Sequence, residues 1–237
     1  MPVPSPFHDR TSKLCTSYLW KEWSGYHAVR SYDTVIDREY FAFRHAAGLI
    51  DVTPLFKYDV TGKDAGRFLA RVMVRNIAKL RVGRVTYCCW TDDAGKVIDD
   101  GTITRWAEEH FRVTSNEPSL RWLETIARGY DVAIRDTTAE IAVLALQGPE
   151  ARTVLQKATD IDLAKLRFFR AATGRLDKCE VGITRTGYTG DLGYEIWTPN
   201  ENALALYDAV LDAGRQHMIE PCGLDTLDVV RIEAGFM

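Results

Sequence analysis

The sequence predicts an α+β fold with mixed, largely antiparallel sheets and packed helices. Strand-like and helix-like segments interleave along the 237 residues. Several strand-like segments are joined by short turns, which connect antiparallel neighbours rather than the parallel strands of a doubly wound sheet. No linker, low-complexity tract or internal repeat interrupts this pattern.

The first half of the chain supplies a helix-rich start and a meander of strands. Phe68, Leu69, Val72 and Met73 recur at helical spacing, which predicts an amphipathic helix. In chain order we expect an irregular, packed N-terminal arm over 1–30, helices over 38–47 and 63–74, strands over 56–60, 85–91, 97–106 and 111–114, and a helix that begins near Pro118 and stops at Gly129.

The second half of the chain alternates strands and helices. A buried strand is expected before the turn at Gln147-Gly148-Pro149, and Asn200 is expected to cap a long helix. The expected elements are strands over 132–134 and 141–146, a helix over 149–158, a strand pair over 175–186, and helices over 201–217 and 224–234.

Composition and charge narrow the function classes. Hydrophobic residues make up 46% of the chain, which is enough to bury a sizeable core. The net charge of −3 gives no long-range attraction to nucleic acid or to an anionic membrane. No apolar run approaches the ~20 residues of a membrane span, and the N-terminus lacks a secretory signal pattern.

The cysteines favour a reduced, cytoplasmic protein. They are odd in number and form no C-x-x-C pair, so a zinc site and a disulfide framework both fit poorly. Cys222 follows Pro221 and precedes an expected helix, whose dipole would favour a thiolate, but we expect a small buried residue at this position. The cysteines are Cys15, Cys88, Cys89, Cys179 and Cys222.

The segment from Arg185 to Glu195 contains the densest chemistry in the chain. Its three glycines, at a spacing of three, permit tight turns and a close approach to a ligand. Their spacing matches neither the dinucleotide fingerprint nor a phosphate-binding P-loop. The residues after Gly193 alternate like a strand, so we predict a glycine-rich hairpin with Glu195 on the outgoing strand; a purely structural turn is the alternative.

Two adjacent aspartates stand in an expected strand. Because aspartate is depleted in strands and successive side chains face opposite sides, Asp99 and Asp100 require separate explanations. The carboxylate on the covered side is either satisfied by backbone donors or held for a ligand. No histidine stands in a catalytic or metal-ligating pattern. Carboxylates and tyrosines of this kind suit a flat heteroaromatic ligand whose ring carries N–H donors.

Five blocks of sequence, in this order, resemble the aminomethyltransferase (T-protein) family of the glycine cleavage system. The resemblance runs from about Tyr32 to the last residue and implies the tetrahydrofolate-binding portion of that family. It implies one folate-binding domain over 1–237 with interleaved subdomains, in which about 55–130 form an inserted lobe. The family's C-terminal β-barrel domain is missing, and the apolar ending Phe236-Met237 suggests a chain cut within a longer protein. The blocks are His45–Pro54, Lys96–Asp100, Ala145–Ala151, Arg185–Ile196 and Gly223–Gly235.

The resemblance also implies site residues. Asp100 matches the family's catalytic aspartate, which lies near N10 of tetrahydrofolate and helps to orient and activate it. Glu195 matches the carboxylate that binds the pterin edge. Three further folate contacts are matched by Tyr87, Asn116 and Tyr188. No metal is implied.

The resemblance implies a transferase that passes a methylene group from an aminomethyl donor, carried on a lipoyl protein, to tetrahydrofolate. Three positions depart from the family pattern: Leu227 replaces an arginine, Pro54 replaces a histidine, and Gly101 replaces a large apolar residue. These changes leave two alternatives open. One is a folate-dependent demethylase of an O-, S- or N-methyl compound, and the other is a non-catalytic folate-binding regulatory protein.

Overall fold

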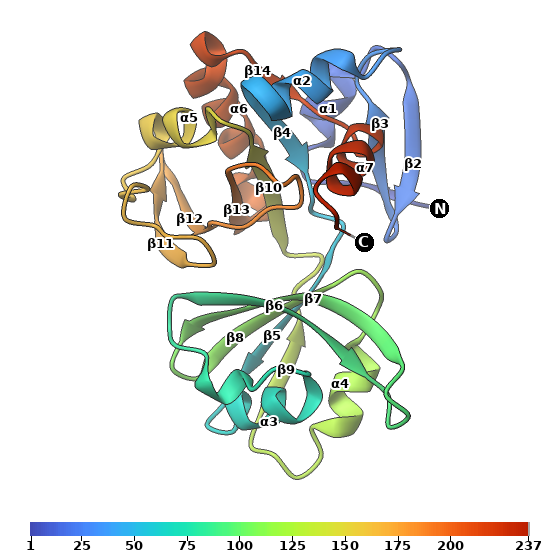
Figure 1. Cartoon of the computed structure of the whole chain (residues 1–237), viewed down its shortest axis with the longest axis vertical. Coiled ribbons are helices and arrows are strands. Elements are labelled where there is room, and N and C mark those ends of the chain that lie inside the picture. Colours follow the sequence, from blue (N-terminus) through green and yellow to red (C-terminus); the bar gives the residue numbers. More distant parts are fainter. Residues whose placement is uncertain (237) are drawn as a thin grey trace. The chain divides into compact units, whose positions relative to one another are not determined.

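The computed structural model describes residues 1–236, which form two compact units (Figure 1). Met237, the last residue of the apolar ending noted above, lies outside the described residues. The first unit is discontinuous and comprises Met1–Pro54, Ile141–Phe168 and the residues from Ala172 onward. The second unit comprises Leu55–Glu140 and Phe169–Ala171. Helices and mixed sheets occur together, which confirms the predicted α+β class.

The first unit is built on a six-stranded sheet in the order β11-β12-β13-β10-β4-β14. The pairings of β10 with β13 and β4 are antiparallel, and β14 runs parallel to β4. The strands of this sheet are β4 (Ala47–Asp51), β10 (Ile141–Gln147), β11 (Ala171–Leu176), β12 (Cys179–Thr184), β13 (Gly193–Pro199) and β14 (Ile219–Pro221). The helices next to them in the chain are α2 (Asp37–His45), α5 (Ala151–Ala158), η2 (Asn200–Asn202), α6 (Ala203–Gly214), η3 (Arg215–His217) and α7 (Leu224–Glu233).

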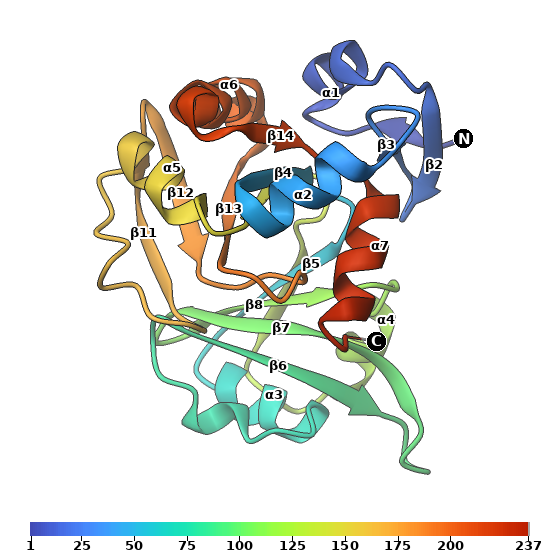
Figure 2. The same ribbon diagram turned by 45° about the horizontal axis from the view of Figure 1, so that its top comes forward.

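The central strand β10 explains why this sheet forms. Its residues are apolar almost without interruption, and from Ala142 to Gln147 every residue is buried. A strand with both faces covered needs such a continuous apolar run. One face packs against α5 and α6 through Leu155, Leu206 and Tyr207, and Figure 2 shows these two helices beside one another.

The N-terminal segment differs from the irregular arm expected over 1–30. It contains α1 and a three-stranded sheet in the order β1-β3-β2. The expectation was wrong because aromatic side chains occupy both faces of β2 and hide the alternation on which strand prediction depends. The elements are β1 (Val3–Pro4), α1 (His8–Leu14), β2 (Leu19–Trp23) and β3 (Tyr26–Ser31).

The second unit is a five-stranded antiparallel sheet in the order β6-β7-β8-β5-β9. Its core joins Phe68 and Leu69 of α3 to Trp90 and Ile103 of the sheet. In Figure 1 both of its α-helices lie on one side of the sheet. The elements are β5 (Phe56–Thr61), α3 (Ala65–Val72), η1 (Ile77–Lys79), β6 (Arg84–Thr91), β7 (Val97–Ala107), β8 (His110–Ser115), α4 (Leu120–Ile126) and β9 (Ala133–Asp136).

The predicted elements differ from the observed ones mainly at helix ends. The helix expected over 201–217 is divided into η2, α6 and η3. Asn200 does not cap α6, whose N-cap is Asn202, and Asn202 makes no capping hydrogen bond through its side chain. Within the part of the chain that the structure describes, no helix combines the length and apolar character needed to cross a membrane.

Candidate functional site

The paired aspartates of β7 lie in two different environments. Asp99 is buried and Asp100 is half-buried, as the alternation of a strand requires. Asp100 lies opposite Cys89 of β6 in the strand register. The two carboxylates therefore face opposite sides of the second unit's sheet, and only one of them needs to be satisfied internally.

Asp99 is the carboxylate that backbone donors satisfy. Its Oδ2 accepts hydrogen bonds from the backbone N–H groups of Asn116 (3.1 Å) and Glu117 (2.9 Å). Its Oδ1 accepts one from the backbone N–H of Asp100 (2.8 Å). Asp99 thus joins β7 to the residues that follow β8 and has a structural role.

Asp100 carries the polar chemistry on the other face of β7. The hydroxyl of Tyr87 donates a hydrogen bond to Oδ2 of Asp100. Tyr87 is on β6 and is 43% exposed. Asn116 is exposed beside this strand end, and its side-chain amide faces Glu117 Oε1 at 3.5 Å. The structure therefore brings Tyr87 and Asp100 together and places Asn116 on the loop that Asp99 anchors.

Gly101 lies at a close approach between β7 and the end of β8. A Cβ atom at this position would lie 1.9 Å from the carbonyl oxygen of Thr114. The hydroxyl of Thr114 accepts a hydrogen bond from the backbone N–H of Thr102 (2.9 Å). The close approach leaves room only for glycine at this position.

We expect Gly101→Ala to lower the free energy of unfolding by about 2 kcal/mol, because the strands must separate to admit the methyl group. Gly66→Ala in α3 is the matched control. Its Cβ would meet ordinary contacts of 3.5 Å or more, and alanine favours a helix. Urea unfolding of both variants checks the prediction. Equal stabilities of the two variants would contradict it.

Glu195 lies in the first unit on β13, directly opposite Thr184 of β12. Its Oε2 accepts hydrogen bonds from the hydroxyls of Thr186 (2.7 Å) and Thr184 (3.2 Å). Burial raises the pKa of Glu195, and the two hydroxyls act in the opposite direction. Among the described residues no hydrogen bond reaches Oε1. Glu195 therefore presents one oxygen that is held and one that is available to a ligand.

The glycine-rich segment between β12 and β13 is a hairpin, as predicted, because these two strands pair antiparallel. Two of its glycines approach a buried side chain of the protein. A Cβ at Gly187 or Gly193 would lie within 2 Å of Gln147 Oε1. Gly190 has a φ of +81° and abuts Ala234. The glycines thus serve internal packing, and it is the side chains around them that remain for a ligand.

Tyr188 lies at the tip of this hairpin. Its ring stacks on Phe236, with centroids 5.1 Å apart and planes inclined by 25°. Arg44 of α2 holds the same hairpin by donating to the carbonyl of Thr189 (2.9 Å) and by pairing with Asp191. The hairpin is therefore tied to α2 through Arg44.

The sequence-predicted residues fall into two groups. Tyr87, Asp100 and Asn116 belong to the second unit, and Glu195 and Tyr188 belong to the first. Sequence reasoning missed the side chains that hold Glu195 and the hairpin. Thr184 and Thr186 could have been found from their period-2 spacing before the hairpin. The contacts of Arg44 and Gln147 become visible only once distant segments of the chain are paired. The missed residues are Arg44, Gln147, Thr184 and Thr186.

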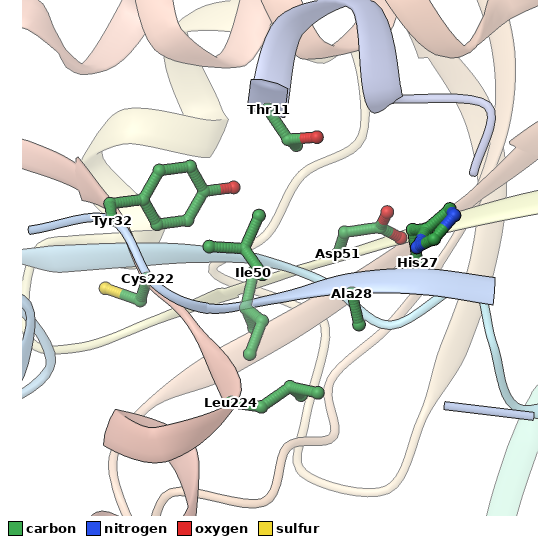
Figure 3. Close-up of a pocket in the computed structure, with 9 residues that line it drawn as sticks. Thr11, His27, Ala28, Tyr32, Ile50, Asp51, Cys222 and Leu224 are labelled. Carbon is green, nitrogen blue, oxygen red and sulfur yellow. The ribbon is translucent and has the colours of Figure 1, made fainter. Parts of the chain in front are cut away.

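Two other features of the chain offer no reactive site. Cys222 is buried, and burial raises the pKa of its thiol well above the ordinary value, which confirms the small buried residue and contradicts the thiolate. A cavity of about 10 Å³ lies nearby, lined by side chains that include Tyr32, Asp51 and Thr11 (Figure 3). That volume corresponds to about one water molecule.

Among residues 1–236, no group of three or more His, Cys, Asp or Glu side chains could hold a metal ion.

Comparison with known proteins identifies one family over almost the whole chain. The family model described as the GCVT N-terminal domain matches residues 7–237. The chain is 40% identical over 204 residues to an aminomethyltransferase of Geobacillus thermodenitrificans, covering 84% of this chain and 56% of that protein. It is 35% identical over 219 residues to that of Caldanaerobacter subterraneus subsp. tengcongensis, covering 90% and 58%. The chain therefore spans between half and two thirds of the length of these relatives.

Solved structures show the same fold. The glycine cleavage system aminomethyltransferase T from Bartonella henselae matches with a TM-score of 0.89 and 28% identity, over 100% of this chain and 64% of that one. A chain of heterotetrameric sarcosine oxidase from Corynebacterium sp. U-96 matches with a TM-score of 0.61 and 18% identity, over 90% of this chain and 95% of that one. The second likeness concerns the fold alone.

Proposed function

Because this chain belongs to the family of the GCVT N-terminal domain, we propose that it is the folate-binding portion of an aminomethyltransferase of the glycine-cleavage type. Its substrate would be tetrahydrofolate, and its partner would be a protein that carries the aminomethyl group on a lipoyl arm. The five cysteines are free thiols, which is consistent with the proposed cytoplasmic location.

The single observation that best supports folate binding is the state of Glu195. Glu195 is half-buried, burial raises its pKa, and among the described residues only Oε2 receives hydrogen bonds, so a ligand that donates to Oε1 would offset the cost of burying this carboxylate. Its free oxygen, Oε1, suits the N–H donors of a pterin edge. Tyr188 of the same unit is 39% exposed and supplies an aromatic ring that stacks on Phe236.

Asp100 is the proposed catalytic carboxylate. When both substrates are bound, the N5 and N10 amines of folate would capture the methylene group to give 5,10-methylenetetrahydrofolate, and their two protons would leave with ammonia and with the thiol of the lipoyl arm. Asp100 would orient N10 by accepting a hydrogen bond and would stabilise positive charge that develops during transfer. Tyr87 would fix the orientation of Asp100 through the hydrogen bond described above.

We expect Glu195→Gln to weaken tetrahydrofolate binding about 30-fold, because a hydrogen bond to a charged group is replaced by a mismatched amide. The matched control is Glu180→Gln on the neighbouring strand β12, where the side chain is exposed. Titration calorimetry under anaerobic conditions measures both affinities. An unchanged affinity of Glu195→Gln would refute the proposed pterin contact.

Leu227 supports a second candidate function on the same fold. It is half-buried on α7 and cannot make the polar contact of the arginine in the family pattern. A demethylase that passes a methyl group from an O-, S- or N-methyl compound to tetrahydrofolate would need a less polar donor channel.

Incubation with tetrahydrofolate and each donor distinguishes the two candidate functions. Formation of 5,10-methylenetetrahydrofolate indicates the aminomethyltransferase, and formation of 5-methyltetrahydrofolate indicates the demethylase. Folate binding without either product would indicate a regulatory protein.

A further inference from the structure

A chain of three side chains leads to Glu195 on one face of the β12–β13 pair. Thr184 and Glu195 are opposite each other in the register, as are Gly182 and Trp197. Because side chains alternate along strands, Trp197 lies on the same face as Glu195. Thr184, Thr186 and Trp197 are all buried. The indole Nε1 of Trp197 is 3.2 Å from Thr184 Oγ1, and the two threonine hydroxyls are 2.7 Å apart.

The direction of the hydrogens in this chain is fixed by chemistry. An indole N–H can only donate, so Trp197 donates to the hydroxyl of Thr184. Each threonine has one hydrogen to give. Thr186 makes the shorter bond to Glu195 Oε2, at 2.7 Å against 3.2 Å for Thr184. The best assignment therefore gives the hydrogen of Thr184 to Thr186 and the hydrogen of Thr186 to Glu195.

We propose that Trp197, Thr184 and Thr186 form a relay of positioning residues that holds Glu195 Oε2 as an acceptor and makes Oε1 the only oxygen that contacts the ligand. This inference rests on the proposed function, in which Glu195 binds the pterin. The hydrogen that Thr186 directs at Oε2 disfavours a proton on that atom. A proton on Glu195 would therefore reside on Oε1.

The relay has a consequence for ligand recognition. A carboxylate whose two oxygens are both free can accept two parallel hydrogen bonds from a planar pair of N–H groups. Its plane can also rotate to follow the orientation of that pair. Glu195 cannot rotate without breaking its hydrogen bond to Thr186. Its contact is therefore restricted to one donor in one direction, which selects how a flat heteroaromatic ring lies against the strand. Successive donors along such a chain also strengthen one another.

The relay is tested first in the ligand-free protein. Carbon-13 labelling of glutamate carboxyl groups follows the titration of Glu195, assigned by the signal that disappears in Glu195→Gln. Thr186→Val should move this titration to higher pH, because a hydroxyl donor to the carboxylate is lost, and Thr186→Ser should restore it. Thr198→Val is the matched control. It also removes a buried hydroxyl from this sheet, one that donates to the carbonyl of Glu180 at 3.0 Å.

The second measurement is the affinity for tetrahydrofolate by titration calorimetry. We expect Thr186→Val to bind about 10-fold more weakly and Trp197→Phe about 3-fold more weakly, with Thr186→Ser and Thr198→Val close to the parent protein. A Thr186→Val protein whose Glu195 titrates as in the parent would overturn the relay. If instead Glu195→Gln leaves the folate affinity unchanged, the proposed function fails, and the titration of the ligand-free protein still decides the relay on its own.

Discussion

Asp100→Asn is expected to lower folate-dependent methylene transfer by about 100-fold while the protein remains folded and still binds tetrahydrofolate. The substitution keeps the size of the side chain and its hydrogen bond with Tyr87, but it removes the negative charge. Because Asp100 is only half-buried and holds no backbone donor, its loss leaves no unsatisfied group in the core. Turnover is measured as 5,10-methylenetetrahydrofolate formed from an aminomethyl-lipoyl protein.

Asp99→Asn provides the matched control for this prediction, since it makes the same change at the adjacent residue. There the carboxylate accepts backbone hydrogen bonds from Asn116 and Glu117 through one oxygen. An amide at this position would lose acceptor capacity, so we expect the unfolding midpoint to fall by several degrees, roughly as a loss of 2 kcal/mol predicts. Turnover that survives in Asp100→Asn and fails only in Asp99→Asn would reverse the assignment of roles.

The distinction between these two aspartates was partly accessible from the sequence. Alternation along a strand requires them to face opposite sides, and the depletion of aspartate in strands marks both as special. Which of the two is satisfied internally depends on the path of the chain after β8. The N–H groups of Asn116 and Glu117 reach Asp99 because the two segments stay close beyond the last paired residues of β7 and β8, as the hydrogen bond from Thr102 to Thr114 shows. No local pattern encodes that long-range approach.

The glycine-rich hairpin shows the same limit. Its strands and the position of Glu195 follow from local alternation, and the structure confirms both. The sequence did not show that two of the glycines pack against Gln147, because that contact requires β10 to lie beside β13. Residue types that permit close approach do not reveal what is approached. The folate-binding roles of Tyr87, Asn116 and Tyr188 stay predictions.

The packing of α7 leads to the second large expected effect, at Glu39. This carboxylate of α2 is buried and lies at the N-terminus of α7. It accepts hydrogen bonds from the backbone N–H of Gly223 (2.7 Å), the hydroxyl of Thr226 (2.9 Å) and the backbone N–H of Tyr32 (2.6 Å). One side chain therefore joins α2, the end of β3 and the first turn of α7, where a negative charge is favoured.

We expect Glu39→Gln to lower the free energy of unfolding by about 3 kcal/mol, equivalent to about 9 °C in the unfolding midpoint, because at least one buried N–H loses its acceptor. Glu220→Gln on β14 is the control. Its carboxylate pairs with Arg38, an exposed side chain, and such pairs contribute about 0–1 kcal/mol.

Burial raises the pKa of Glu39 above its ordinary 4.5, so the folded state binds the proton of Glu39 more tightly than the unfolded state. The stability that Glu39 contributes is then complete below pH 4.5 and declines as the pH rises through the higher folded-state pKa. We measure thermal unfolding of the parent protein and of Glu39→Gln from pH 4 to pH 7. The difference between their free energies of unfolding should become smaller as the pH rises. A difference that grows with pH would contradict this account of Glu39.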